Sequence, residues 1–419
     1  MSKTIVICCD GTGNSDTGVP SNVKQLYDFV LVDAAQVATY HRGVGTDARR
    51  DGQSWLAYTW RHVTELCFGE GIDATLADLY GWLAAAYDDG DRLFLFGFSR
   101  GAFTARALAG MIHVCGLLKR GEPVSPHDVV RRYRGSEARI KAERRRRGLP
   151  AACGPCEIDH AAVDVDAMEF AARHCRPCVI DFLGLWDTVK AYGWVWPRSF
   201  PALRHNTSVR TVRHAAALDE GRALFQMTGW ASAHIDVKEV WFAGDHSDVG
   251  GGHETGNSAL ADASLRWMLG EAYGAGMRLT PPPDERGAAL RHAGALAPGT
   301  PPKGRWKRWA FLPLDCLPRI ELDNHAYPPR RAARMLWPFG ARCPGDHAFG
   351  STVWVHDSVD ARRLGGDRCY RTSRLVRRSW SLRRRAPLDV RRVCDRPVPW
   401  EDQRSDTTIR SASTTIVTP

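Results

Sequence analysis

The sequence predicts an α/β protein in which a mostly parallel β-sheet is covered by helices on both faces. Short apolar runs with the composition of buried strands alternate along the chain with longer runs that have helical spacing. This alternation is typical of parallel sheets, because parallel neighbours need long, usually helical, connections. The chain has 419 residues, of which 44% are hydrophobic, so it has enough apolar material for one large core.

The first part of the chain contains two predicted strands and two predicted helices. Thr4–Cys9 is a continuous, β-branched apolar run followed by glycines, which predicts a buried strand. Residues 73–87 carry leucine, tryptophan and alanine at helical spacing and lead into Asp-Asp-Gly, which ends a helix. Residues 92–98 predict a second strand, and the alanine-rich residues 100–117 predict a helix directly after it.

The second part of the chain continues the same alternation. Residues 179–186 and 237–242 are apolar runs that predict two further strands. Residues 258–273 have apolar positions at helical spacing and predict an amphipathic helix.

Two irregular regions separate these elements. Residues 122–178 are charged and contain cysteines, which predicts an insertion or lid, and residues 279–345 are rich in proline and arginine, which predicts a cap. From about residue 384 the chain is rich in Arg, Pro, Ser and Thr, as in poorly ordered tails. We therefore expect one domain over residues 1–360 that includes both irregular regions, and a basic, partly disordered C-terminal extension over residues 361–419.

The positive charge of the chain is concentrated in two places. The formal net charge is +10, and much of the excess is arginine in residues 139–147 and from residue 362 onward. Such blocks are usually solvated faces or mobile tails, but the charge favours anionic partners, among them a membrane surface. We expect no nucleic-acid partner, because the basic segments lack interleaved aromatic residues and any recognisable binding module.

The N-terminal segment lacks the pattern of a signal peptide, because its short apolar run ends at Asp10. No stretch approaches the roughly 20 apolar residues that span a bilayer. We therefore expect synthesis in the cytoplasm and, for action elsewhere, export by a route without a leader.

Residues 97–101 read Gly-Phe-Ser-Arg-Gly and lie between a predicted strand and a predicted helix. This is the setting of a nucleophile elbow, in which a tight turn holds a serine in a strained, projecting position, as in the α/β-hydrolase fold. Ser99 is therefore the candidate nucleophile. The backbone N–H of Arg100, at the helix N-terminus, is a candidate oxyanion donor. An ordinary glycine-flanked turn is the alternative interpretation.

A serine nucleophile needs a base, and the base needs an acid that orients it. Asp187 and His246 each follow a predicted strand, so we expect both at the carboxyl edge of the sheet, where open α/β sheets bind ligands. The chain order Ser99, Asp187, His246 is that of an α/β-hydrolase triad. Asp248 and His356 form an alternative acid–base pair at similar positions, and the sequence favours the first pair.

The loop after the first strand lies at the same edge and begins Asp10, Gly11, Thr12. The backbone N–H groups of Gly11 and Thr12 are candidates for the second half of an oxyanion hole, with Asp10 bracing the loop. A phosphate-binding loop is disfavoured, because no Gly-Lys-Ser/Thr follows and no dinucleotide fingerprint is present.

The chain contains 12 cysteines, four of which form two C-x-x-C pairs: Cys153, Cys156, Cys175 and Cys178. With 18 residues between the pairs, this is the spacing of a structural zinc site with four thiolates. Isolated thiols are the alternative, which the sequence favours because Cys178 leads directly into a predicted strand. We expect no cofactor to be required for catalysis.

Six blocks occur in the order of a known family. They are CCDGTGNS, YHRGVGT (40–46), GFSRGAFTAR (97–106), FLGLWDTV (182–189), RHAAALDEGRALF (213–225) and WFAGDHSDVGGGH (241–253). Together they make residues 3–360 resemble an α/β-hydrolase domain family that includes the type VI secretion lipase effectors of the first class.

The resemblance implies a phospholipase or esterase that cleaves acyl esters of glycerophospholipids, with Ser99, Asp187 and His246 as the catalytic triad. An acyltransferase or a small-ester esterase that uses the same triad is one alternative, and a non-catalytic interaction domain is another. The sequence identifies no immunity protein or secretion partner.

Overall fold

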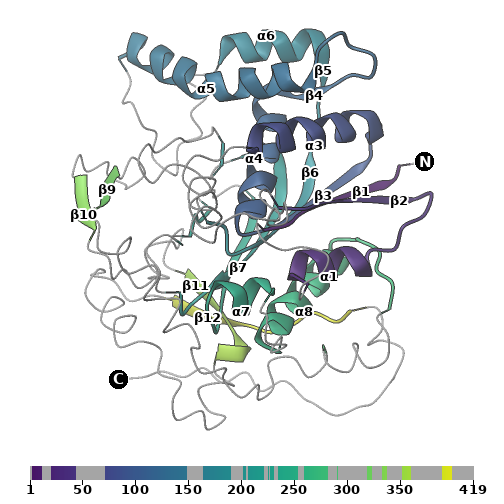
Figure 1. The fold of residues 1–419 in the computed structure, drawn as a ribbon, viewed down its shortest axis with the longest axis vertical. Helices are drawn as coiled ribbons and strands as arrows, with labels where there is room; N and C mark the ends of the chain where they lie inside the picture. Colours follow the sequence, from purple (N-terminus) through teal and green to yellow (C-terminus); the bar gives the residue numbers. More distant parts are fainter. Residues whose placement is uncertain are drawn as a thin grey trace, which may run out of the picture.

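The computed structural model describes twelve stretches of the chain, which include Ser99, Asp187 and His246 (Figure 1). They are residues 2–11, 20–43, 71–148, 164–189, 206–220, 227–230, 235–252, 259–281, 319–322, 333–336, 352–359 and 389–398, with positions 202, 203, 225 and 290.

The centre of the fold is an eight-stranded sheet of described residues in the order β12-β11-β8-β7-β6-β3-β1-β2. Every pair of neighbours in this sheet is parallel, which confirms the predicted α/β fold. Its strands are β1 (Thr4–Cys9), β2 (Gln36–His41), β3 (Arg92–Phe98), β6 (Ile180–Trp186), β7 (Val209–Ala217), β8 (Asp236–Phe242), β11 (Thr352–His356) and β12 (Asp389–Val393).

Helices cover both faces of the sheet (Figure 1). In β1, Ile5 and Ile7 pack against α3 (Ile72–Ala86) and α4 (Arg100–Cys115), whereas Val6 and Cys8 face the core under α1 (Asn22–Phe29) and α8 (Ala259–Gly274). Because successive side chains of a strand point to opposite faces, a strand covered on both sides is apolar throughout. This explains why β1, β3 and β6 could be predicted closely from their apolar runs.

A third layer lies outside α3 and α4, at the top of Figure 1. It contains α5 (Pro126–Arg146), α6 (Val165–His174) and the short antiparallel pair β4 (Leu117–Leu118) and β5 (Cys175–Arg176). Residues 122–178 are therefore largely helical where they are described, and not irregular, while their interpretation as an insertion or lid stays a prediction. The apolar stripe of α5 is narrow, with Val129, Val130 and Tyr133 buried. Because most other positions of this helix are charged, the helical spacing of its apolar residues is hard to recognise in the sequence.

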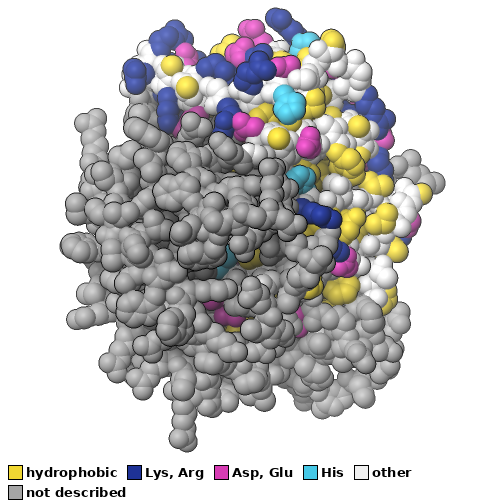
Figure 2. All heavy atoms as spheres, viewed as in Figure 1, with side chains coloured by type: hydrophobic (Ala, Val, Ile, Leu, Met, Phe, Trp, Pro, Cys, Tyr) yellow, Lys and Arg dark blue, Asp and Glu magenta, His cyan; other side chains and the backbone are white. Residues whose placement is uncertain are grey.

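The arginine block at residues 139–147 falls on the second half of α5 and just beyond its end. Figure 2 shows Lys and Arg side chains gathered over this layer. Most of the block is a solvated helix face, but the Arg144 side chain is buried.

The sheet continues beyond residue 360, where the sequence suggested that the domain ends. β12 pairs in parallel with β11, and the segment after β12 lies along α8, where Asp395 contacts Arg266 at 3.5 Å and Val398 is buried. Residues 389–398 therefore belong to the domain and not to a separate extension. An edge strand needs few apolar residues, which is why Asp-Val-Arg-Arg-Val did not suggest a strand.

Residues 279–345 were predicted to form a cap, and only parts of them are described. β9 (Arg319–Leu322) and β10 (Ala333–Leu336) form an antiparallel pair. None of the described helices has the length and apolar character required to cross a membrane.

Candidate active site

Ser99 lies in a sharp turn between β3 and α4, and its backbone is in the left-handed region with φ of 56°. The turn requires the two flanking glycines. A Cβ on Gly97 would lie 2.6 Å from Cα of Ala102, and a Cβ on Gly101 would overlap the backbone at Cys9. The strained backbone and close packing are those of a nucleophile elbow, in which the serine side chain projects from the end of the strand.

Asp187 follows the last residue of β6 and also has a positive φ, 37°. Its backbone N–H donates to the carbonyl oxygen of Ala215 at 2.8 Å, and its carboxylate oxygen Oδ1 accepts from the N–H of Ala217 at 3.0 Å. The side chain is fully shielded from solvent. The other carboxylate oxygen, Oδ2, lies 2.6 Å from Nδ1 of His246.

His246 is the first residue of the short helix α7 (His246–Gly250), which follows β8. Its backbone N–H donates to the Glu220 carboxylate at 3.3 Å, a contact that sequence analysis did not anticipate although Glu220 lies in one of the six family blocks. Its Nε2 lies 2.8 Å from Oγ of Ser99. With Nδ1 donating to Asp187, Nε2 can accept the serine proton. The structure thus brings together Ser99, His246 and Asp187, the candidate nucleophile and the acid–base pair that the sequence favours.

The alternative pair does not form. Asp248 completes a capping box at the start of α7, where its carboxylate accepts from the N–H of Asp245 at 3.0 Å. Both ring nitrogens of His356 are engaged elsewhere, with Ser358 at 3.0 Å and with Asp395 at 3.1 Å.

Comparison with known proteins identifies the family. Residues 3–271 match the model of the family described as T6SS, phospholipase effector Tle1-like, catalytic domain. The chain belongs to this family. The match confirms the resemblance inferred from the six sequence blocks.

The chain is also similar to a protein whose function is uncharacterized. An uncharacterized protein of Saccharomyces cerevisiae is 29% identical over 231 residues, which cover 54% of this chain and 32% of the yeast protein. The chain thus spans about a third of the length of that relative.

Two solved structures are each 20% identical to this chain. One is an uncharacterized protein from Pseudomonas aeruginosa, with a TM-score of 0.38, covering 69% of this chain and 48% of that one. The other is the Tle1 effector bound to the VgrG spike of the type VI secretion system, with a TM-score of 0.27, covering 60% of this chain and 51% of that one.

Two of the predicted oxyanion donors, the N–H groups of Arg100 and Gly11, lie beside Ser99, but the N–H of Gly11 already has an acceptor. Arg100 is the first residue of α4, so its backbone N–H lies at the helix N-terminus beside Ser99. Gly11 also lies beside Ser99, since an added Cβ would be 3.3 Å from the serine Cβ. However, the N–H of Gly11 donates to Oδ1 of Asp10 at 2.6 Å, so in this structure it is engaged by that carboxylate. Thr12 lies outside the described residues.

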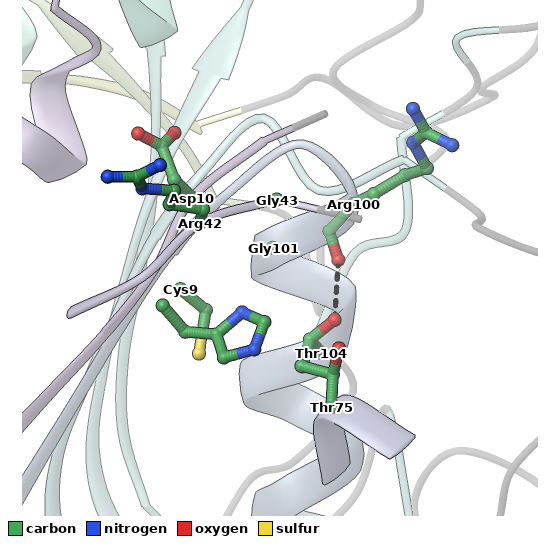
Figure 3. Close-up of a pocket in the computed structure, with 9 residues that line it drawn as sticks. Cys9, Asp10, Arg42, Gly43, Thr75, Arg100, Gly101 and Thr104 are labelled. Carbon is green, nitrogen blue, oxygen red and sulfur yellow. Dashed lines mark hydrogen bonds between the residues drawn. The ribbon is translucent and has the colours of Figure 1, made fainter. Parts of the chain in front are cut away.

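Asp10 braces the start of this loop, as the sequence suggested. Its Oδ2 accepts hydrogen bonds from the hydroxyl groups of Ser21 and Tyr40, each at 2.6 Å. Asp10 also lines a small pocket at the start of α4, together with Thr75 and Thr104 (Figure 3). The Arg100 side chain extends away from these residues in Figure 3, while its carbonyl oxygen accepts from the Thr104 hydroxyl at 3.1 Å.

The zinc prediction concerns four cysteines, two of which, Cys153 and Cys156, lie outside the described residues. Cys175 and Cys178 are buried, and burial raises the pKa of their thiols to about 11 and about 12. Within the described part of the chain, no three His, Cys, Asp or Glu side chains are grouped as metal ligands would be. The four-thiolate site stays a prediction.

Proposed function

We propose that the chain is a serine ester hydrolase that cleaves acyl esters of phospholipids. The observation that carries the proposal is the continuous hydrogen-bonded relay from Asp187 through His246 to Ser99, with distances of 2.6 and 2.8 Å. Membership of the Tle1-like phospholipase effector family supports the choice of substrate.

In the acylation step, the Ser99 oxygen attacks the ester carbonyl carbon while Nε2 of His246 takes the serine proton. The Asp187 carboxylate accepts from Nδ1–H throughout, so it holds the required tautomer and stabilises the imidazolium that forms. His246 then donates the proton to the departing alcohol oxygen, which leaves as a lysophospholipid. In the second step, water adds to the acyl-serine with His246 again acting as base, and the fatty acid is released.

The negative charge that develops on the carbonyl oxygen needs nearby donors. The N–H of Arg100 is the proposed first donor, because it lies at the positive end of α4 directly after the nucleophile. The sequence-based candidates for the second donor are Gly11 and Thr12. A Gly11 donor requires that its N–H leave Asp10 when substrate binds. No step of this mechanism requires a cofactor.

The test is incubation of the purified protein with a panel of phospholipids, followed by mass spectrometry of the products. The wild type should release fatty acid and lysophospholipid, and Ser99→Ala should release neither. Ser358→Ala is the matched control, because Ser358 is another buried serine in contact with a histidine, His356, outside the site. Acyl transfer to an added alcohol in preference to water would identify an acyltransferase. Absence of any Ser99-dependent product would contradict the proposal.

We extend the proposal to the place of action. The family description names the type VI secretion system, so we propose delivery by that apparatus toward a membrane that contains the substrate. The tagged protein should appear in the medium of cells with a working apparatus and not in that of cells without one. Equal amounts in both would contradict this part.

A further inference from the structure

A second buried histidine lies directly behind the acid of the proposed relay. His214 belongs to β7, the neighbour of β6, and its side chain is fully buried. Its Nε2 lies 3.1 Å from the backbone nitrogen of Thr188, the residue that follows Asp187. Its Nδ1 lies 2.8 Å from Oε1 of Glu239 on β8. The ring therefore connects the end of β6 to a carboxylate two strands away.

The partners of His214 define where its proton lies. The N–H of Thr188 can only donate, so Nε2 must accept, and the ring proton must be on Nδ1, where it is donated to Glu239. Burial lowers the pKa of His214 from its usual value, an effect that the hydrogen bond to Glu239 opposes without reversing it. The ring is therefore neutral and in one tautomer. A proton on Nε2 would face the N–H of Thr188.

Glu239 and Arg106 both lie beside this ring. Oε1 of Glu239 also accepts from the backbone N–H of Trp230 at 2.9 Å. Arg106 extends from α4, lies over the Trp230 ring at 5.3 Å and donates to a carbonyl of the same segment at 3.1 Å. Its Nη2 lies 3.5 Å from Nδ1 of His214. These contacts thus connect the helix that follows the nucleophile with the strand end that carries the acid.

Positive φ is uncommon for residues other than glycine, although aspartate adopts it more often than most, so contacts around Asp187 help to hold this conformation. Both backbone groups of the next residue, Thr188, are bonded: its N–H, in the peptide that follows Asp187, donates to His214, and its carbonyl accepts from the N–H of Thr228 at 2.9 Å. Without His214, the buried N–H of Thr188 would lose this acceptor. Rotation of the peptide toward an ordinary conformation would then turn the Asp187 carboxylate away from His246.

We propose that His214 is a positioning residue for the acid of the relay. Acting through the N–H of Thr188, it holds Asp187 in the strained conformation in which its carboxylate meets His246. Glu239 keeps the His214 ring in the required tautomer, because its carboxylate accepts from Nδ1–H. This inference rests on the proposed hydrolase function, and His214 itself touches neither substrate nor reacting atoms.

The experiment compares His214→Leu with His356→Leu in the hydrolysis of a short p-nitrophenyl ester. His356 is the matched control, because it is a buried histidine of the same sheet that bonds a carboxylate, Asp395, and lies on β11, which β8 and β7 separate from β6. We expect His214→Leu to lower kcat by about 10-fold to 100-fold and to change KM by less than about threefold. We expect His356→Leu to keep kcat within about twofold of the wild type when assayed well below its Tm.

A conservative variant and a spectrum complete the design. His214→Gln places an amide oxygen where it can accept from the N–H of Thr188, so it should recover part of the lost kcat. A nitrogen-15 NMR spectrum of the imidazole groups in the wild type should show His214 with its proton on Nδ1, and this measurement does not depend on whether any variant folds.

Two results would overturn the inference and leave the proposed function standing. One is an equal loss of kcat in His214→Leu and His356→Leu, and the other is a proton on Nε2 of His214. If the wild type shows no Ser99-dependent hydrolysis, the proposed function fails and the inference fails with it.

Discussion

The imidazole ring of His246 packs on the phenyl ring of Phe98, with ring centroids 4.7 Å apart and planes inclined by 33°. Phe98 is the last residue of β3 and immediately precedes Ser99, so His246 packs against the strand that leads into the proposed nucleophile. Phe225 contacts the same imidazole nearly edge-on at 4.9 Å. The two aromatic rings limit His246 to orientations close to the one in which Nε2 faces Ser99.

Gly250, in α7, packs directly against Phe98, and a Cβ at that position would overlap the Phe98 ring. We predict that Gly250→Ala displaces Phe98, misaligns His246 and lowers kcat for ester hydrolysis by about 10-fold to 100-fold. Gly81→Ala is the control, since Gly81 lies inside α3 and, among the described residues, its added Cβ would meet Pro126 alone, at 3.1 Å. An unchanged kcat in Gly250→Ala would show that the orientation of His246 does not depend on Phe98.

Substitution of the two candidate acids separates their roles. Asn at position 187 keeps the size of the side chain but favours the wrong tautomer of His246, so Asp187→Asn should lower kcat by about 10⁴-fold. Asp248→Asn should leave kcat within about threefold and reduce the free energy of unfolding by about 1 kcal/mol, because Asp248 completes the capping box of α7. Steady-state kinetics and urea unfolding measure both effects. The opposite order of kcat losses would assign the acid role to Asp248.

The sequence predicted the strands that are continuous apolar runs and the residues that follow them. β1, β3 and β6 are continuous apolar runs, and Ser99 lies in a turn with a local signature. β7 was not predicted as a strand, because Arg213 and His214 interrupt its apolar pattern. Both side chains are buried and bonded to acids distant in the chain: Arg213 to Glu271, and His214 to Glu239.

The choice between Asp187 and Asp248 could be favoured but not settled from sequence. Both follow a strand, and a capping box needs only an acid three residues after the cap, a pattern that also suits a site residue. In the structure, α7 begins at His246 and directs the Asp248 carboxylate back to the N–H of Asp245, which is why we propose Asp187 as the acid. The alternative base, His356, is likewise engaged by Asp395, which lies beyond the predicted end of the domain.

Asp164 makes stability depend on pH. Burial opposes its ionisation, but hydrogen bonds from Arg139 and from the N–H of Ala167 outweigh it, and the pKa of this carboxyl is below its usual value. The ionised form therefore contributes stability that is present above the unfolded pKa of about 3.9 and is lost as the pH falls through the folded pKa.

Asp164→Asn tests this dependence, because asparagine can still cap α6 by accepting from Ala167. At pH 7 the variant should have a free energy of unfolding lower by about 1.5 to 3 kcal/mol. The difference from the wild type should shrink as the pH falls below about 4. Urea unfolding over this pH range measures it. An equal difference at every pH would rule out the charged contact with Arg139 as its source.

The position of β12 predicts where the domain can be shortened. A chain that ends after residue 360 lacks β12, the contact of Asp395 with Arg266 and the buried Val398, so it should be insoluble or unfold at a markedly lower temperature. A chain that ends after residue 400 retains these contacts and should unfold close to the wild-type temperature. Thermal unfolding of both chains measures the effect. A stable, active chain 1–360 would contradict the assignment of β12 to the domain.

The central claim is that Ser99 is a nucleophile activated by His246 and Asp187. Its most direct test is treatment with a fluorophosphonate, followed by peptide mass spectrometry to locate the adduct. We predict a single phosphonyl group on Ser99, no adduct in Ser99→Ala, and labelling slowed by at least about 100-fold in His246→Ala. An unmodified Ser99 in the wild type, or labelling at the same rate in His246→Ala, would contradict the account.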